Sequence, residues 1–124
     1  MDETVVLDAN VILRYLLQDH DLSAEADKVI KNHNLVARTE VVCEVVYVLQ
    51  KVYSVDRKEV SEVLRRFMNL AQMYNPEPAV IAGALDLYGD SRLDFVDCIL
   101  IAVNKTEGLE IATFDKEMLK ILDN

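Results

Sequence analysis

Several residue types are scarce in this chain, and each shortage narrows the class of protein. Among 124 residues there are only 3 Gly and 2 Pro, and 52% of the residues are hydrophobic. This balance indicates a compact globular domain and not a disordered chain. The 2 Cys, Cys43 and Cys98, form no CxxC pair and lie among Val and Ile. We therefore expect reduced core thiols and no disulfide or zinc site.

Positive charge is scarce as well. The chain has 13 Lys and Arg against 22 Asp and Glu, a net charge of −9. A protein that binds nucleic acid through a broad electrostatic field is normally basic, so this charge argues against that class. Residues 76–124 hold 10 of the acids and only 4 of the bases. A bound cation would reverse the local field that a phosphate ester meets there.

The chain has the length of one ordinary domain, and no linker, repeat or low-complexity tract divides it. The first apolar stretch is short and contains Asp8, which supports neither a secretory signal nor a membrane span. We therefore expect a single cytoplasmic domain over residues 1–124.

Alternating apolar patterns predict an α/β fold. Strands are expected at residues 3–8, 35–37, 72–74 and 110–112. Helices are expected at 10–17, 23–34, 40–52, 57–71, 79–88, 94–105 and 115–122, with Thr39 and Asp56 as N-caps and a turn at 89–91. Helices that separate short strands imply right-handed crossovers and a parallel sheet with helices on both faces.

Four carboxylates occupy places where such a sheet would open into a cleft. Asp8 and Asp115 end apolar runs, so both are expected at the carboxyl ends of strands, where open α/β sheets bind ligands. Glu44 and Asp97 lie inside apolar helical segments, where an unpaired charge is costly unless a cation offsets it. Scattered carboxylates suit Mg²⁺ or Mn²⁺, and two such ions can activate water for phosphodiester cleavage.

Each of these acids also has a structural interpretation. Asp8 and Asp115 could simply cap the helices that follow them. Glu44 could form a buried ion pair with Arg14 or Arg38.

Further polar and aromatic residues leave alternatives open. Asp94 lies three residues before Asp97 on one helical face, and it is either an N-cap or a member of the site. Tyr47 and Tyr53 are expected to pack, not to stack on bases. The base-rich stretch is a candidate RNA track, but the interleaved Glu59 and Glu62 favour a solvated helix face. Its bases are Lys51, Arg57, Lys58, Arg65 and Arg66.

The segments that carry these acids resemble the PIN domain, and together they span nearly the whole chain. They are residues 5–13, 39–44, 94–102 and 112–117. The size and the lack of additions are most similar to VapC-type toxins of prokaryotic toxin–antitoxin pairs. The resemblance implies a PIN-like fold with a parallel sheet of about four to five strands. It also implies a Mg²⁺- or Mn²⁺-dependent ribonuclease, commonly a homodimer, that a cognate antitoxin holds inactive.

The resemblance also assigns roles to individual residues. The acids that match the family pattern are Asp8, Glu44, Asp97 and Asp115, and Asp97 fits its register better than Asp94. Asn10 and Thr113 match polar residues that family members often place beside the metals. Arg14 lies four residues after Asn10, on the same side of the helix, where it would hold a phosphate or pair with Glu44.

Two other classes were weighed against this one. A phosphorelay receiver needs paired acids after its first strand and a lysine after its last, but here Ala9 and Asn10 follow Asp8, and Asp115 ends the late strand. A catalytically inactive PIN-like module that only binds a protein is the second alternative, and the presence of all four acids argues against it.

Overall fold

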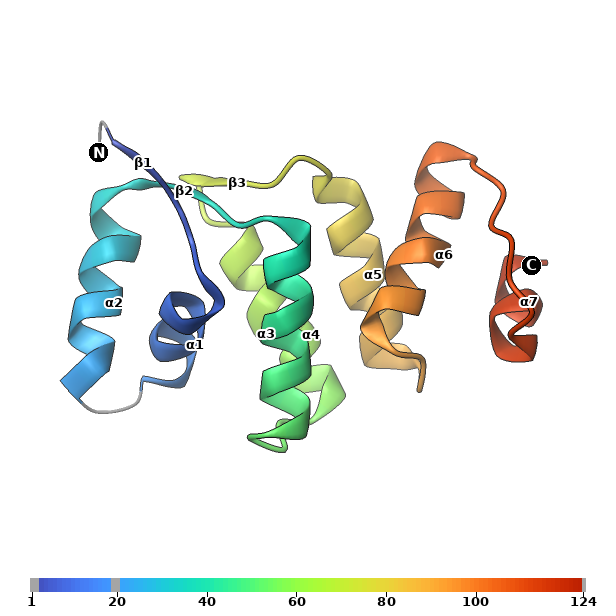
Figure 1. The fold of residues 1–124 in the computed structure, drawn as a ribbon, viewed down its shortest axis with the longest axis horizontal. Helices are drawn as coiled ribbons and strands as arrows, with labels where there is room; N and C mark the ends of the chain where they lie inside the picture. Colours follow the sequence, from blue (N-terminus) through green and yellow to red (C-terminus); the bar gives the residue numbers. More distant parts are fainter. Residues whose placement is uncertain (1–2, 19–20, 124) are drawn as a thin grey trace.

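A computed structural model describes residues 3–18 and 21–123, and it confirms the α/β fold. Three short strands, β1 (Thr4–Val6), β2 (Asn34–Val36) and β3 (Met73–Tyr74), form a parallel sheet in the order β1-β2-β3. In Figure 1 the strands lie along the top of an elongated molecule, and the helices lie below them and to their right. The two-residue β3 confirms the strand expected at residues 72–74.

Seven helices are present in the described residues, close to their expected positions. They are α1 (Ala9–Leu17), α2 (Asp21–Asn32), α3 (Thr39–Lys51), α4 (Arg57–Met68), α5 (Pro78–Asp90), α6 (Phe95–Glu107) and α7 (Lys116–Leu122). Two expectations were wrong at their ends, because α4 stops before residue 71 and α5 runs through most of the expected turn at 89–91. None of these helices is both long enough and apolar enough to span a membrane.

The strand expected at residues 110–112 is not formed. Gly108, with φ 73°, ends α6 in the left-handed conformation, and residues 108–115 then follow an irregular path to α7. Only Ile111 is a large apolar residue within 110–112, so a strand there would bury little apolar surface. In the described part of the chain, β1 therefore has no strand on its outer edge, and the sheet has three strands instead of four or five.

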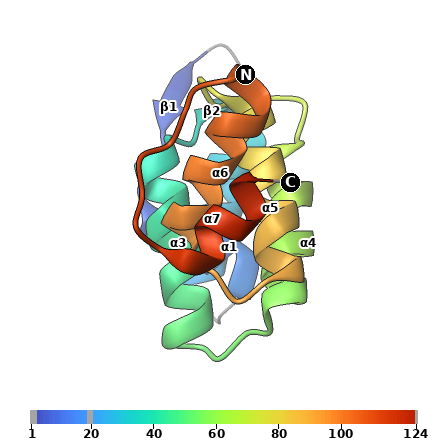
Figure 2. The same cartoon turned by 90° about the vertical axis from the view of Figure 1, so that its right-hand side faces the viewer.

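Helix α7 packs against α6 at one end of the molecule. Figure 2, which views that end directly, shows α7 crossing in front of α6. Met118 is buried in this contact, whereas Phe114 in the preceding connection is fully exposed. The connection thus places a large aromatic side chain in solvent beside the last helix.

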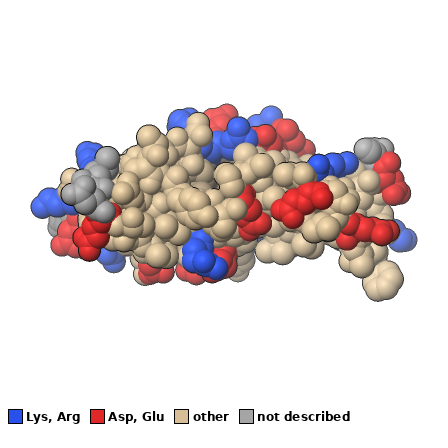
Figure 3. Space-filling view, turned by 90° about the horizontal axis from the view of Figure 1, so that it is seen from above, with Lys and Arg blue, Asp and Glu red and all other residues tan. Residues whose placement is uncertain are grey.

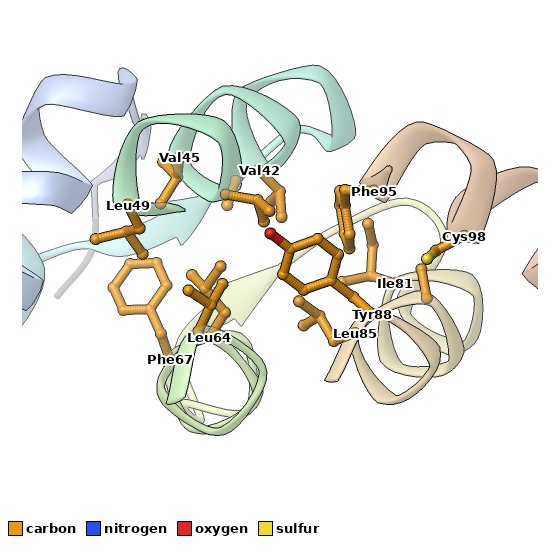
Figure 4. Packing of buried hydrophobic residues seen from close by; sticks show 14 of the residues in the cluster. Val42, Val45, Leu49, Leu64, Phe67, Ile81, Leu85, Tyr88, Phe95 and Cys98 are labelled. Carbon is orange, nitrogen blue, oxygen red and sulfur yellow. The ribbon is translucent and has the colours of Figure 1, made fainter. Parts of the chain in front are cut away.

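Helix α5 is the centre of the hydrophobic core. It packs against α4 and α6, and its buried residues include Leu85 and Tyr88. Figure 4 shows the Tyr88 ring among residues of three helices, with Val42 from α3 and Phe95 from α6 as neighbours. The rings of Tyr88 and Phe95 meet edge to face, with centroids 5.8 Å apart. This packing fixes the start of α6 relative to α3.

The two cysteines are free, as expected, but only one belongs fully to the core. Cys98 is completely buried, and burial raises the pKa of its thiol to about 11. Cys43 is half-buried on α3, and burial raises its thiol pKa as well.

Asn75 joins the ends of two strands to the helices that follow them. It is 5% exposed, and its Nδ2 donates to the Ala37 carbonyl at 2.7 Å while its Oδ1 accepts from the Glu77 amide at 2.8 Å. The Thr39 hydroxyl donates to the Glu77 carboxylate at 2.6 Å. Thr39 is the first residue of α3 and not its N-cap, which is Arg38. These bonds join the segments from which α3 and α5 start.

Replacement of Asn75 by Ala should lower the free energy of unfolding by about 1–3 kcal/mol, because it leaves a buried carbonyl and an amide without their partner. Urea unfolding measures the change. Asn69→Ala, at an exposed position after α4, is the matched control and should change stability by less than about 0.5 kcal/mol. Equal losses in both variants would contradict the role of Asn75.

Candidate active site

The start of α6 brings two of the candidate acids together. Asp94 occupies the N-cap position, but its side chain makes no capping hydrogen bond. Asp97 lies in the first turn, on the same helical face, and both residues line one pocket. Burial raises the pKa of the half-buried Asp97 carboxyl, and the charges of Asp94 and Asp115 raise it further. The Asp97 carboxyl therefore lies within electrostatic range of two other carboxylates.

Asp115 is the N-cap of α7 and performs the capping role that its sequence position suggested. Its Oδ1 accepts from the Met118 amide at 2.9 Å. The Thr113 hydroxyl accepts from the Asp115 amide at 3.1 Å, so Thr113 shapes the turn before the helix. Since a carboxylate has two oxygens and the cap uses one, capping leaves Asp115 able to act on Asp97 as well.

Asp8 occupies a similar position after β1. It is the N-cap of α1, its side chain is exposed, and it makes no capping bond. Asn10 follows in the first turn, and Arg14 lies four residues later, both also exposed. Asp8 thus occupies the N-cap position that was suggested, but its carboxylate makes no capping hydrogen bond.

The expectation that Glu44 is buried was wrong. Val42, Val45 and Val46 of α3 face the core. Each step of one residue along a helix rotates the side chain by about 100°. Glu44, next to Val45, therefore faces solvent. The suggested ion pair with Arg38 does not form, because Arg38 binds Glu40 at 2.7 Å on the surface. Glu44 has no ion pair within the described ranges.

The acids do not form a closed cage. Within residues 3–18 and 21–123, no three carboxylate, His or Cys side chains approach closely enough to hold one ion. Asp97 lies with Asp94 and Asp115, while Asp8 and Glu44 stand on other elements. Mg²⁺, however, usually binds one or two carboxylates and keeps several waters, so the donors around Asp97 fit such an ion chemically. Figure 3 shows several carboxylates over the half of the molecule that contains α6 and α7, and others at the opposite end.

Arg57 fixes the start of α6 on which these acids lie. Its Nε donates to the Tyr88 carbonyl at 3.0 Å, and its Nη2 donates to the carbonyl of Leu93, the residue before Asp94. The guanidinium also lies over the Tyr88 ring, 3.7 Å from the centroid. The expectation of a solvated face was wrong for Arg57, which is half-buried.

The other bases of this stretch behave as expected for a solvated face. Lys58 pairs with Asp90 at 4.0 Å, and Arg65 pairs with Asp86 at 2.7 Å, all on exposed side chains. Such pairs contribute little to stability.

Sequence reasoning missed Gln50 and did not place Tyr47 and Lys51 of α3 beside the acids. A pocket of about 420 Å³ next to Asp94 and Asp97 is lined by Tyr47, Gln50 and Lys51 among others. Tyr47, which was expected to pack, is 62% exposed. The four-residue spacing from Tyr47 to Lys51 was the available signal, because it places an aromatic ring and a cation on one helical face.

Comparison with known proteins gives two positive findings. The PIN domain family matches residues 5–123. A VapC ribonuclease of Aquifex aeolicus (strain VF5) is 26% identical over 123 residues, which cover 94% of this chain and 90% of that protein. No solved structure matches the chain significantly.

Asp97→Asn should stabilise the metal-free protein at neutral pH. A carboxyl with a raised folded-state pKa binds more protons in the folded protein than in the unfolded chain, so stability falls as pH rises from the ordinary value of 3.8 through the raised pKa. Below 3.8 the variant and the wild type should melt alike, and above the raised pKa the variant should melt higher. Thermal melts with a chelator across this range measure the difference. Asp90→Asn is the surface control, and a variant that melts lower at neutral pH would contradict the repulsion.

Proposed function

Because the chain belongs to the PIN-domain family, we propose that it is a ribonuclease that hydrolyses RNA phosphodiester bonds with the help of Mg²⁺ or Mn²⁺. The observation that carries the proposal is that Asp94 and Asp97 line one pocket at the start of α6, with Asp115 near enough for its charge to raise the pKa of Asp97 further. Carboxylates that repel one another at neutral pH are stabilised by a cation. The similar protein of Aquifex aeolicus is named a ribonuclease, which supports RNA as the substrate.

The residues around Asp97 would hold the ion. When bound, the ion would lower the pKa of a water molecule and offset the charge of the phosphate. Asp97 and its neighbours Asp94 and Asp115 would supply oxygen ligands from α6 and α7. Asp8 would approach from the end of β1 and Glu44 from α3, and these two would complete the ligand set or orient the attacking water.

Supporting roles follow from position. Asn10, next to Asp8 in sequence, and Thr113, which hydrogen-bonds the Asp115 amide, would hold these acids in place. Arg14, exposed on α1, would contact a phosphate of the substrate. Membership of the PIN family removes the receiver-like alternative. An inactive protein-binding module is the alternative that the cleavage experiment below tests.

We further propose that the protein is the toxin of a toxin–antitoxin pair and a homodimer. The likeness to a VapC ribonuclease supports the first part. For the second, exposed apolar side chains lie on β1 and on the connection before α7, namely Val6 (65% exposed), Leu109 (55%) and Phe114 (102%). Figure 1 places β1 and this connection at opposite ends of the molecule, so the two ends carry separate apolar surfaces. The surface around Phe114 is the one that a second copy would cover.

Purified protein should cleave a mixed single-stranded RNA in Mn²⁺ and not in EDTA. Asp97→Asn should reduce the rate by about 100-fold or more while keeping the fold, because the removed charge weakens ion binding. Asp94→Asn should lose much less if Asp97 is the principal ligand. Asp90→Asn serves as the acid control and should cut at the wild-type rate. Full activity in well-folded Asp97→Asn would refute the mechanism, and no cleavage by wild type would favour the inactive module.

Light scattering on the wild-type protein should give twice the chain mass of 14.1 kDa at micromolar concentration. Phe114→Ser should shift the particle toward the monomer, because it removes the most exposed apolar side chain. Tyr74→Ser changes a 60% exposed ring on the opposite edge strand and should leave the mass unchanged. A wild-type particle of one chain mass would rule out the dimer.

A further inference from the structure

A pocket opens directly beside the acids at the start of α6. Its volume of about 420 Å³ lies within the range of about 300–1,000 Å³ that is usual for small-molecule sites. Val46, Tyr88 and Phe95 form its apolar lining and are at most 5% exposed. Asp94 and Asp97 line the same space. A flat apolar group bound here would therefore lie next to the carboxylates of the candidate site.

Helix α3 borders this pocket with three residues on one face. Cys43, Tyr47 and Lys51 follow one another at intervals of four and all line the pocket. Tyr47 is 62% exposed, although its neighbour Val46 is buried in the core. Packing within the chain therefore does not account for the position of the Tyr47 ring. An aromatic face at the rim of a pocket is a platform on which a base can stack.

The polar residues of the rim suit a nucleotide. Lys51 supplies a positive charge that can contact a phosphate, and the amide of the half-buried Gln50 offers both a donor and an acceptor to a base edge. Arg57 also lines the pocket, but its guanidinium is engaged by two backbone carbonyls. If one phosphate of an RNA strand lies at Asp97, the next nucleotide would place its base over Tyr47 and its phosphate at Lys51.

We propose that this pocket binds one base of the RNA substrate beside the scissile phosphate, with Tyr47 as the stacking surface, Gln50 at the base edge and Lys51 at the adjoining phosphate. The inference rests on the proposed ribonuclease function, because it places the substrate of that same site. It also explains how an acidic protein holds RNA. Stacking on an aromatic ring does not depend on net charge.

A second cavity, of about 320 Å³, lies between α4, β3 and α5. It is lined by residues such as Arg65, Tyr74 and Asn75 and by none of the candidate acids. A base bound there would lie away from Asp97. The pocket beside α6 is therefore the one that the substrate would use.

A tryptophan reporter tests the pocket without any cleavage. The chain has no Trp, so Tyr47→Trp introduces a single indole, whose emission a stacked base quenches. The probes are the four ribonucleoside 5′-monophosphates in Mn²⁺, which carry a base and a phosphate but no phosphodiester bond. At least one should quench the emission saturably, by about twofold or more, and inorganic phosphate should not. Tyr53→Trp, beyond the end of α3 and 49% exposed, is the matched control and should change little.

Steady-state cleavage of a short RNA supplies the second measurement. Tyr47→Ala should raise KM about tenfold and leave kcat within about threefold, because a lost stacking contact weakens substrate binding more than the chemical step. Tyr47→Phe keeps the ring and should match the wild type. Circular dichroism checks that Tyr47→Ala is folded, and the reporter remains decisive if it is not.

The outcomes separate this inference from the proposed function. Quenching by nucleotides without RNA cleavage would support the base-binding pocket and contradict the proposed ribonuclease function. Cleavage with equal KM in Tyr47→Ala and Tyr47→Phe, or equal quenching at positions 47 and 53, would overturn the pocket alone. A change in Tyr47→Trp emission with protein concentration, and none with nucleotide, would show that a second copy covers Tyr47 and would also overturn the inference.

Discussion

The bonds of Arg57 to the Tyr88 and Leu93 carbonyls are the constraint on which the site depends. The side chain starts at the first residue of α4, stacks on a ring of α5 and holds the residue before the N-cap of α6. A buried cation must have its charge offset, and here carbonyl dipoles and a ring face do so without using a carboxylate. Asp94 and Asp97 are therefore held beside a cation that leaves both of them free to bind something else.

The charged carboxyl of Asp97 lowers the stability of the metal-free fold, and the fold does not need a carboxylate at this position. Burial and two like charges oppose the charged form of Asp97, whereas an Asn at the same position would avoid the repulsion. Asp115 gains a capping bond to the Met118 amide, but its charge and that of Asp94 oppose the charged form of Asp97 unless a cation is present. This balance is the physical reason to treat the start of α6 as a candidate site.

The sequence predicted the elements better than their contacts. Helices and the first three strands followed from apolar periodicity, which reports burial along one element. The strand at 110–112 failed because a short apolar run does not show whether a neighbouring strand is available, and Gly108 turns the chain toward α7. The Glu44 error had the same origin. The flanking valines correctly indicate that α3 packs on the core. Which side chains face the core depends on how the helix is rotated about its axis, and a shift of one residue position is enough to turn a side chain from the core to solvent.

The orientation of α3 about its axis places two sets of candidate functional residues outside the core. With its valines turned inward, the helix presents Glu44 to solvent and presents Tyr47 and Lys51 to the pocket beside Asp97. In the sequence, Tyr47 looked like part of the apolar run, because nothing local distinguishes a ring that packs from a ring at a pocket rim. In the structure, Tyr88 and Phe95 line the buried side of the pocket that Tyr47 also lines, and the Tyr47 ring stays 62% exposed. An exposed aromatic ring at a pocket that Asp94 and Asp97 also line is an arrangement that suits a nucleotide.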